Sequence, residues 1–187
     1  MTMPTLPDTD LAPTSIHIPT LETERLFLRA LREDDIDEEA AFFASERSAF
    51  VGGPLAREQV WRAVAGMIGH WGLRGFGFWG LEEKAGGRYL GRVGLWAPDG
   101  WPEPELGWTL MAHAEGRGFA REAALAARAF AYDHLGWTTA ISLIAAGNTR
   151  SEALATRLGA TLERAWLHPV HGAMNIWRHP GPLEAAR

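Results

Sequence analysis

The chain has 187 residues, of which 47% are hydrophobic and 22% are charged, and its formal net charge is -5. This length and balance suit one globular domain and exclude a low-complexity or intrinsically disordered chain. The absence of cysteine excludes a disulfide scaffold, a thiolate zinc site and a cysteine nucleophile.

The charge and hydropathy pattern also narrows the partners and the location. No run of about 18 hydrophobic residues is present, so we expect no membrane span. The start of the chain lacks a basic segment followed by a hydrophobic one, and we therefore expect a cytoplasmic protein. Lys84 is the only lysine among the 18 basic residues, and the arginines are spread along the chain. Without a basic cluster we expect no nucleic-acid partner.

Hydrophobic periodicity predicts a mixed α/β domain. Leu26 and Leu28 alternate with other residues as in a strand with one buried face, whereas Val60, Val64 and Trp71 recur at helical spacing. In chain order, the pattern predicts a strand over 23–30, a helix from Ile36, a helix over 57–73, strands over 76–82, 89–96 and 105–111, a helix over 118–135, a strand over 139–146, a helix over 149–158, and strands near 161–167 and 173–179. The predicted order is therefore β-α-α-β-β-β-α-β-α-β-β.

The domain organisation is simple, because the chain shows no internal repeat and no linker. The first 20 residues are rich in Thr and Pro, and we expect a flexible tail over 1–20. We expect one domain over 21–180 and a short C-terminal tail over 181–187.

Several common functional motifs are excluded. A phosphate-binding P-loop needs Gly-Lys-Ser/Thr, and Ala85 follows the only lysine. Gly75, Gly77 and Gly80 match G-x-G-x-x-G, but no helix is predicted after them, so the match is not a dinucleotide site. No serine lies in a Gly-x-Ser-x-Gly elbow, and the histidines are scattered without acids at metal-ligand spacing, so we expect no metal.

One stretch predicts an anion-binding site. The predicted strand over 105–111 leads through a short loop to Gly116 and Gly118, directly before a long helix. Glycines allow successive backbone N–H groups to converge, and the helix N-terminus adds partial positive charge. Arg117 and Arg121 add full charges. This arrangement suits a diphosphate, although the same residues are also compatible with an ordinary glycine-rich turn before a helix.

At this point the sequence resembles a known family. Glu115–Ala120 is similar to the Q/R-x-x-G-x-G/A motif of the GNAT superfamily of acyl-CoA N-acyltransferases. Three more segments resemble its ribosomal-protein, RimJ/RimL-like branch, namely Thr23–Arg29 (T-E-R-L-x-L-R), Glu105-x-Gly107-Trp108, and Asn148-x-x-Ser151 followed by Leu158-Gly159. The resemblance covers about residues 20–180. It implies a central, mostly antiparallel sheet with helices on both faces.

The resemblance also implies site residues. The backbone of Trp108, Thr109 and Leu110 would hold the pantetheine arm of acetyl-CoA, with the Leu110 amide facing the thioester oxygen. The diphosphate would lie on the amides of Gly116, Arg117, Gly118, Phe119, Ala120 and Arg121. Asn148 would hydrogen-bond the pantetheine, and Ser151 would lie near the departing sulfur.

Two residues depart from the family pattern. Glu115 stands where Gln or Arg is usual, and we expect its carboxylate to point away from the diphosphate because like charges repel. Ala155 stands where many members carry a tyrosine acid, which leaves Ser151 as the remaining candidate for that role.

The missing nucleophiles favour direct attack of an amine on the thioester. A lysine-type amine must first lose a proton at a cost of roughly 4–5 kcal/mol at pH 7, whereas an α-amine needs only about 1 kcal/mol. A water relay to a carboxylate would serve the second case. Glu105 is the preferred catalytic base and Glu103 the second choice, although Glu105 is also compatible with a structural role at the strand edge.

The substrate that accepts the acyl group is the part of the function that the sequence determines least. Trp101, in the Pro-rich loop before Glu105, is the first candidate to line the acceptor site, with Trp79 and Trp96 as further candidates. We expect an N-acetyltransferase acting on a primary amine of a protein N-terminus or small molecule. A noncatalytic acyl-CoA-binding module is the alternative, and a nucleotide-binding or redox protein is a third option. The sequence is compatible with a homodimer but does not determine the oligomeric state.

Overall fold

An eight-stranded sheet in the order β1-β2-β3-β4-β5-β6-β8-β7 organises the protein. The computed structural model describes residues 15–169 and 172–182. The strands are β1 (Leu21–Glu22), β2 (Leu26–Arg29), β3 (Phe78–Glu83), β4 (Tyr89–Trp96), β5 (Glu105–Leu110), β6 (Ile141–Ala145), β7 (Thr161–His168) and β8 (Gly172–Arg178). The α-helices are α1 (Ile36–Phe43), α2 (Arg57–Arg74), α3 (Phe119–Asp133) and α4 (Thr149–Arg157), and the 3-10 helices are η1 (Glu33–Asp35), η2 (Glu46–Val51) and η3 (Ala112–Ala114).

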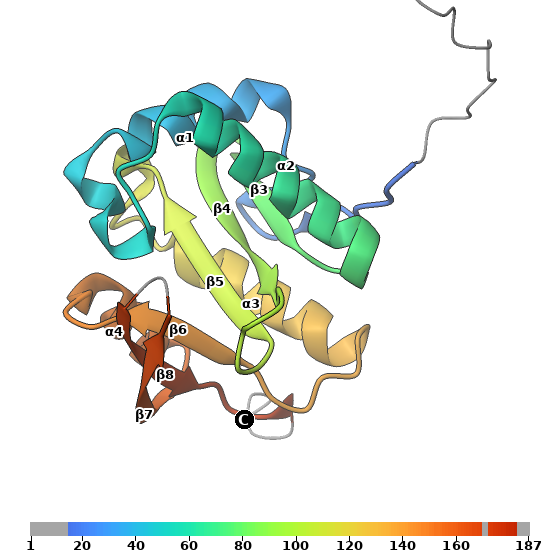
Figure 1. Ribbon diagram of the computed structural model, residues 1–187. Helices are drawn as coiled ribbons and strands as arrows, with labels where there is room; N and C mark the ends of the chain where they lie inside the picture. The colour runs from blue at the N-terminus through green and yellow to red at the C-terminus, as the bar shows by residue number, and fades with distance from the viewer. Residues whose placement is uncertain (1–14, 170–171, 183–187) are drawn as a thin grey trace, which may run out of the picture.

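The sheet is antiparallel except between β5 and β6. These two strands are parallel and pair only at Glu105 and Ile141, after which they separate. Figure 1 shows them diverging toward their C-terminal ends. The predicted fold class, a mostly antiparallel sheet with helices on both faces, is therefore confirmed, and the structure adds an open wedge in the middle of the sheet.

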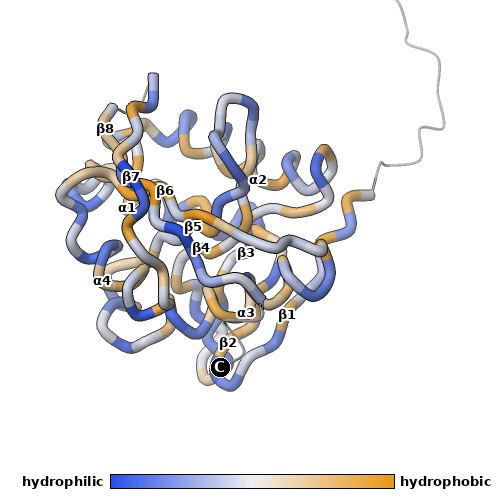
Figure 2. The backbone as a smooth tube through the Cα atoms, turned by 90° about the horizontal axis from the view of Figure 1, so that it is seen from below, coloured by the Kyte–Doolittle hydropathy of each residue, from blue (hydrophilic) through white to orange (hydrophobic). Residues whose placement is uncertain are grey.

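Helices cover both faces of the sheet (Figure 1). Hydrophobic side chains of α1 and α2, including Phe43 and Val64, pack with Tyr89 on one face. On the other face, α3 presents alanines such as Ala123 and Ala127 to the sheet. Small side chains let this helix lie close to the strands. The hydrophobic parts of the tube gather between these layers, with hydrophilic turns outside (Figure 2).

A buried polar group joins α1 to β4. The Glu39 carboxylate, with no exposed surface, accepts hydrogen bonds from the Tyr89 hydroxyl at 2.6 Å and from the Arg92 guanidinium. Arg92 is also buried and lies over the rings of Phe43 and Phe78. Glu39 is therefore a buried counter-ion, although it lies among the acidic residues in the first turn of α1.

The predicted helices and strands are confirmed apart from small shifts at their ends, and β1 and the 3-10 helices are additional. The expectation of a flexible tail over 1–20 needs correction at its end, and most of both tails falls on residues that the structure does not describe. The predicted tail over 1–20 is anchored at its end, because the Trp79 indole donates to the Pro19 carbonyl at 2.8 Å and Ile18 packs on the core. Residues 1–14 and 183–187 lie outside the described residues.

Candidate active site

The open wedge leaves one edge of β5 unpaired. Met111 N–H donates to the Leu90 carbonyl at 2.9 Å, which directs the amide of Met111 toward β4. Alternate residues of a strand direct their amides to opposite sides, so the N–H groups of Trp108 and Leu110 face β6 across the gap. Beyond Glu105 no backbone pairing joins the two strands in the described structure. An extended ligand would find free backbone groups here.

Thr109 corrects one expectation. Its register partner is Arg92, and a Cβ on Gly91 of β4 would lie 2.2 Å from the Thr109 carbonyl oxygen. The backbone of Thr109 therefore belongs to the β4–β5 ladder and does not face the gap. The prediction that it would hold a pantetheine arm is wrong, because neighbouring residues of a strand cannot face the same neighbour.

Three contacts close the narrow end of the wedge. Ile141 N–H donates to the Pro104 carbonyl at 3.2 Å, and the Ser142 hydroxyl donates to the Leu106 carbonyl at 2.6 Å. The Leu143 N–H, which lacks a backbone partner on β5, donates to the Glu105 carboxylate at 3.2 Å. The Glu105 side chain thus replaces strand pairing at the point where the strands part.

The loop before α3 forms a cradle of free amides. Gly116 and Gly118 have φ angles of 73° and 82°, a conformation that side chains with a Cβ rarely adopt. In the part of the chain that the structure describes, no hydrogen bond uses the amide hydrogens of residues 116–121. These donors lie at the N-terminus of a 15-residue helix, where the helix dipole favours anions. The loop therefore has the free amides and the backbone conformation that the predicted anion cradle requires.

The turn between β1 and β2 holds this cradle in place. Glu122, in the first turn of α3, accepts hydrogen bonds from the Thr23 hydroxyl at 2.6 Å and from the Arg25 backbone at 2.8 Å. The Arg25 guanidinium binds the same carboxylate and also the Arg117 carbonyl at 3.0 Å. Burial opposes ionisation of Glu122, but these hydrogen bonds outweigh it and lower its pKa. Thr23 and Arg25 of the Thr-Glu-Arg sequence therefore position the cradle through their hydrogen bonds.

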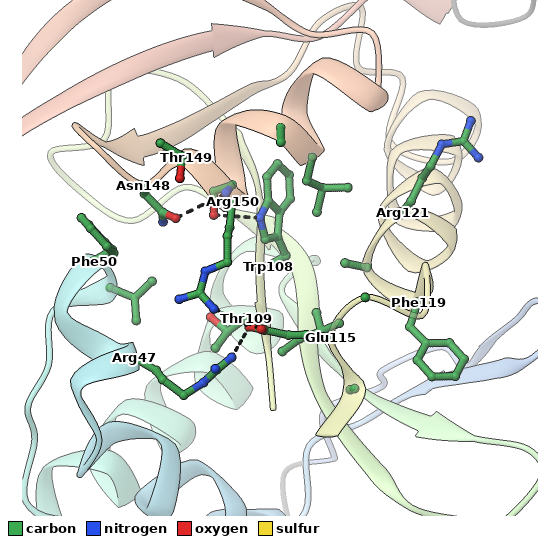
Figure 3. Close-up of a pocket in the computed structure, with 18 of the residues that line it drawn as sticks. Arg47, Phe50, Trp108, Thr109, Glu115, Phe119, Arg121, Asn148, Thr149 and Arg150 are labelled. Atoms are coloured by element: carbon green, nitrogen blue, oxygen red, sulfur yellow. Dashed lines mark hydrogen bonds and ion pairs between the residues drawn. The ribbon is translucent and has the colours of Figure 1, made fainter. Parts of the chain in front are cut away.

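A pocket of about 670 Å³ joins the wedge to the cradle. This volume lies within the usual range of small-molecule sites. Figure 3 shows it between η2, β5, α3 and α4. Most predicted cofactor residues line it, namely Trp108, Thr109, Leu110, Gly116, Gly118, Phe119, Ala120, Arg121, Asn148 and Ser151.

The sequence analysis missed part of the lining. Arg47, Phe50 and Val51 of η2 form one side of the pocket, and Arg150 and Arg157 of α4 form another. The 3-10 helix η2 has only six residues, which is too short for hydrophobic periodicity to reveal it in the sequence. Arg150 lies inside the predicted Asn-x-x-Ser segment, where the adjacent residues could have indicated it.

The two arginines of the cradle have different roles. Arg121 lines the pocket. Arg117, expected to bring its charge to the same place, instead forms an ion pair with Glu83 at 2.6 Å and is not among the lining residues. The expectation for its side chain is therefore wrong, while its backbone amide remains in the cradle. The difference arises because β3 ends with a carboxylate beside the loop.

Asn148 and Ser151 act together at the start of α4. The Asn148 side-chain oxygen accepts the Ser151 N–H at 3.3 Å, which caps the helix and leaves the amide NH₂ group on the pocket side of the cap. The Ser151 hydroxyl oxygen lies 3.3 Å from the Trp108 indole nitrogen, which donates to it (Figure 3). The hydroxyl hydrogen has no acceptor among the described residues. Ala155, by contrast, is fully buried in a small core cluster.

Glu115 also differs from expectation. Its carboxylate does not point away from the pocket but lines it, between the guanidinium groups of Arg47 and Arg150. Figure 3 shows these two side chains approaching Glu115 from different sides. The ion pairs compensate the charge that was expected to turn the carboxylate outward.

Comparisons with known proteins agree with this geometry. The sequence matches the acetyltransferase (GNAT) domain family over residues 25–161. The chain belongs to the GNAT acetyltransferase family. Among curated proteins, no sequence match was found. Members of this family transfer acyl groups from coenzyme A thioesters, so the pocket belongs to an acyltransferase domain.

Solved structures of acetyltransferases are similar. An acetyltransferase from Agrobacterium tumefaciens shares 35% identity with a TM-score of 0.80, over 88% of this chain and 96% of that one. A putative GNAT-family acetyltransferase from Bordetella pertussis shares 26% identity with a TM-score of 0.74, over 87% and 99%. RimL, a ribosomal L7/L12 α-N-protein acetyltransferase solved with coenzyme A, shares the fold at 16% identity and a TM-score of 0.71, over 87% and 98%. At this identity the similarity to RimL shows a shared fold, and the RimJ/RimL-like branch stays a prediction.

In this acetyltransferase the two candidate bases lie in different environments. Glu105 is almost fully buried, and its carboxylate accepts a hydrogen bond from the Trp101 indole at 2.6 Å. Burial raises the pKa of Glu105 to about 7, and the hydrogen bonds from Trp101 and Leu143 only partly oppose this. Glu103 is held by Arg178 at 2.6 and 2.7 Å, which lowers its pKa. Of these two carboxyl groups, Glu105 is the one whose pKa lies near neutral pH.

The buried carboxyl predicts a pH dependence of stability. The pKa of Glu105 is about 7 in the folded acetyltransferase, against an ordinary value of 4.5. The folded state therefore keeps a proton that the unfolded state releases, and stability falls as pH rises from 4.5 through 7. A shift of this size corresponds to roughly 3 kcal/mol. In Glu105→Gln, chemical unfolding at pH 5, 6, 7 and 8 should lack this decline. Parallel stability curves for the two proteins would contradict the assignment.

The predicted acceptor tryptophans separate into three cases. Trp79 is fully buried between Trp71 and Phe130, so its predicted role at the acceptor site is wrong. Trp96 is partly exposed and stacks on His70 of α2, with 4.4 Å between the ring centroids, so its role at the acceptor site stays a prediction. A cluster of aromatic residues near one sequence segment does not specify which faces the core.

Trp101 keeps its predicted place beside Glu105. It is half-buried and packs on the hydrophobic cluster of β6 and β8, with its ring 5.1 Å from that of His168. Its role as an acceptor contact stays a prediction.

No helix that the structure describes has the length and hydrophobicity for a bilayer crossing. Within the same residues, no three metal-ligating side chains gather at one place.

Proposed function

We propose that this acetyltransferase transfers an acetyl group from acetyl-CoA to a primary amine, on a protein N-terminus or a small molecule, by direct attack on the thioester. The observation that carries the proposal is the set of free backbone donors. Residues 116 and 118–121, whose amides are free, and the open edge of β5 line a single pocket. A diphosphate would accept hydrogen bonds from the amides before α3, and an extended pantetheine arm would pair with the open edge of β5.

The residues present fit coenzyme A. Apart from Thr109, nine of the predicted cofactor residues line the pocket, and Gly116 has no neighbour within 4 Å of where a Cβ would lie. The N–H groups of Trp108 and Leu110, facing the gap, are available to the peptide-like units of the pantetheine. Acetyl-CoA would supply the activated acyl group, and this chain's own residues would bind it, orient it and handle protons.

For the chemical step, the Leu110 N–H would hydrogen-bond the thioester oxygen as negative charge develops there. Preorganised backbone donors of this kind contribute large rate effects, because they need no reorganisation during the reaction. The Ser151 hydroxyl hydrogen, free of an acceptor among the described residues, would protonate the departing thiolate. Trp108 holds the oxygen of that hydroxyl and so orients it.

Glu105 would remove the proton from the amine. It lies five positions before Leu110 along an extended strand, which places their backbones about 17 Å apart. Direct contact with an amine at the thioester is therefore excluded, and the proton would pass through water to the buried carboxylate. A relay suits an α-amine, whose deprotonation at pH 7 costs only about 1 kcal/mol.

The proposal is tested by thiol release from acetyl-CoA with a panel of amines, including peptide N-termini and lysine side chains. Thermal stability with acetyl-CoA, coenzyme A, ATP and NAD is measured alongside. We expect stabilisation by the first two ligands and turnover with α-amines. Stabilisation without turnover on any amine would favour the alternative, a noncatalytic acyl-CoA-binding module, and stabilisation only by ATP or NAD would contradict both.

The cradle itself gives a sharper prediction. Gly116→Ala places a methyl group in the open space of the pocket, and we expect the Kd for coenzyme A to rise about tenfold, or about 1.4 kcal/mol. The positive φ also costs about 1 kcal/mol of stability. Isothermal titration calorimetry measures the affinity.

Gly136 provides a matched control, because its φ is 69°, its Cβ would also meet nothing within 4 Å, and it does not line the pocket. Gly136→Ala should lose similar stability but bind coenzyme A as before. Equal affinity losses in the two variants would mean that backbone strain, and not the cradle, is responsible.

A further inference from the structure

One carboxylate joins two walls of the pocket. Glu115 precedes the cradle, Arg47 lies on η2 and Arg150 lies in the first turn of α4. The Arg47 guanidinium binds one carboxylate oxygen of Glu115, and the Arg150 guanidinium binds the other at 3.0 Å. All three residues line the pocket. The ion pairs therefore occupy space that a ligand of this pocket must share.

The charges around the pocket are unequal. Four arginines line it, at positions 47, 121, 150 and 157, and Glu115 is the one acidic residue among the lining residues described. The Nε atom of Arg47 is buried and has no hydrogen-bond partner in the described part of the chain. Arg47 thus has an unused donor beside its ion pair. The site has an excess of positive charge and a single carboxylate that reduces it.

We propose that Glu115 is a displaceable counter-ion, which holds Arg47 and Arg150 until the phosphate groups of coenzyme A replace its carboxylate. The inference rests on the proposed function. It adds Arg47 and Arg150 to the coenzyme-binding residues and makes Glu115 a residue that limits affinity. The exchange breaks no covalent bond and moves no proton.

The exchange follows from the chemistry of the groups. Guanidinium groups bind carboxylate and phosphate oxygens in the same paired geometry, and a phosphate group offers more oxygens and more charge. A phosphate that enters this pocket also meets the like charge of Glu115 in a space partly shielded from water, where repulsion is stronger than in bulk solvent. Binding is more favourable once the carboxylate has left the arginines, and Glu115, with a side chain 36% exposed, has solvent to turn into.

The test compares the Kd for coenzyme A of the wild-type protein and of Glu115→Gln by isothermal titration calorimetry. Removal of the competing charge should lower the Kd about tenfold. Arg47→Gln should instead raise it by a similar factor. Dephospho-coenzyme A and pantetheine are measured in the same way. The gain should be lost with pantetheine, which has no phosphate, and dephospho-coenzyme A shows whether the 3′-phosphate or the diphosphate is the partner.

Glu163→Gln is the matched control. Glu163 also pairs with two arginines, its side chain is 34% exposed, and it lies on β7 outside the pocket lining. It should bind coenzyme A as the wild type does. An equal or weaker affinity of Glu115→Gln, or a gain that persists with pantetheine, would overturn this inference alone. Failure of the wild-type protein to bind coenzyme A would overturn the proposed function and the inference together. Unfolding temperatures without ligand verify that each variant is folded.

Discussion

Glu105→Gln should lower kcat on the order of 100-fold, while the Kd for acetyl-CoA changes less than twofold. The expected loss is at the low end of the range for general acid–base catalysis, because the proton reaches Glu105 through water. The carboxylate is absent from the residues that line the coenzyme pocket, so donor binding should be preserved. Glutamine keeps an oxygen that accepts the Leu143 N–H, and the wedge between the strands should therefore remain.

Steady-state kinetics over pH 5.5–8.5 separates a catalytic from a structural role for Glu105. The pKa of Glu105 is about 7, so kcat/KM of the wild type should rise with pH through this value. The variant should lose this inflection and keep only that of the amine. Glu103→Gln is the comparison, because the pKa of Glu103 is lowered by Arg178 and it already lacks a proton at neutral pH. Unchanged turnover in Glu105→Gln would remove Glu105 from the mechanism, and lost coenzyme binding would make it a structural residue.

Glu39→Ala should have the largest effect on stability. It leaves the guanidinium of Arg92 and the hydroxyl of Tyr89 without their acceptor in the interior. Removal of one partner from a buried ion pair costs about 3–5 kcal/mol, because the remaining charge stays buried and unpaired. Urea unfolding should show a lower midpoint at an unchanged slope.

A second variant separates the lost ion pair from lost packing. Glu39→Leu combined with Arg92→Met removes both charges and keeps hydrophobic volume between α1 and β4. Paired replacement of this kind is often close to neutral. The double variant should be more stable than Glu39→Ala, with about 1 kcal/mol still lost at the Tyr89 hydroxyl. A cost below 1 kcal/mol for Glu39→Ala, or a double variant that is less stable still, would contradict this account of the core.

Prediction from the sequence was most successful where the signal is local. The spacing of Val60, Val64 and Trp71 predicted a helix over 57–73, and the structure has α2 at Arg57–Arg74. The paired glycines predicted the cradle, because only a few residue types adopt positive φ. The glycines that match G-x-G-x-x-G have other structural roles, since Gly75 ends α2 and Gly80 lies within β3.

Prediction failed where a side chain has a choice of partners. Arg117 was expected in the anion site and pairs with Glu83, 34 residues away. Trp79 was expected at the acceptor and lies in the core. Arginine and tryptophan serve surface, core and site equally well, so their type and position do not determine their surroundings.

The sequence by itself determined the order of helices and strands, the family and the loop that presents free amides, because these depend on residues close together in the chain. Only the tertiary structure decided that β5 faces the gap with the amides of Trp108 and Leu110, that Glu105 is buried, and that Glu115 lies between two arginines. Arg47 and Glu115 are 68 residues apart in the chain. Such contacts arise when folded elements pack, and no local pattern encodes the distance between them.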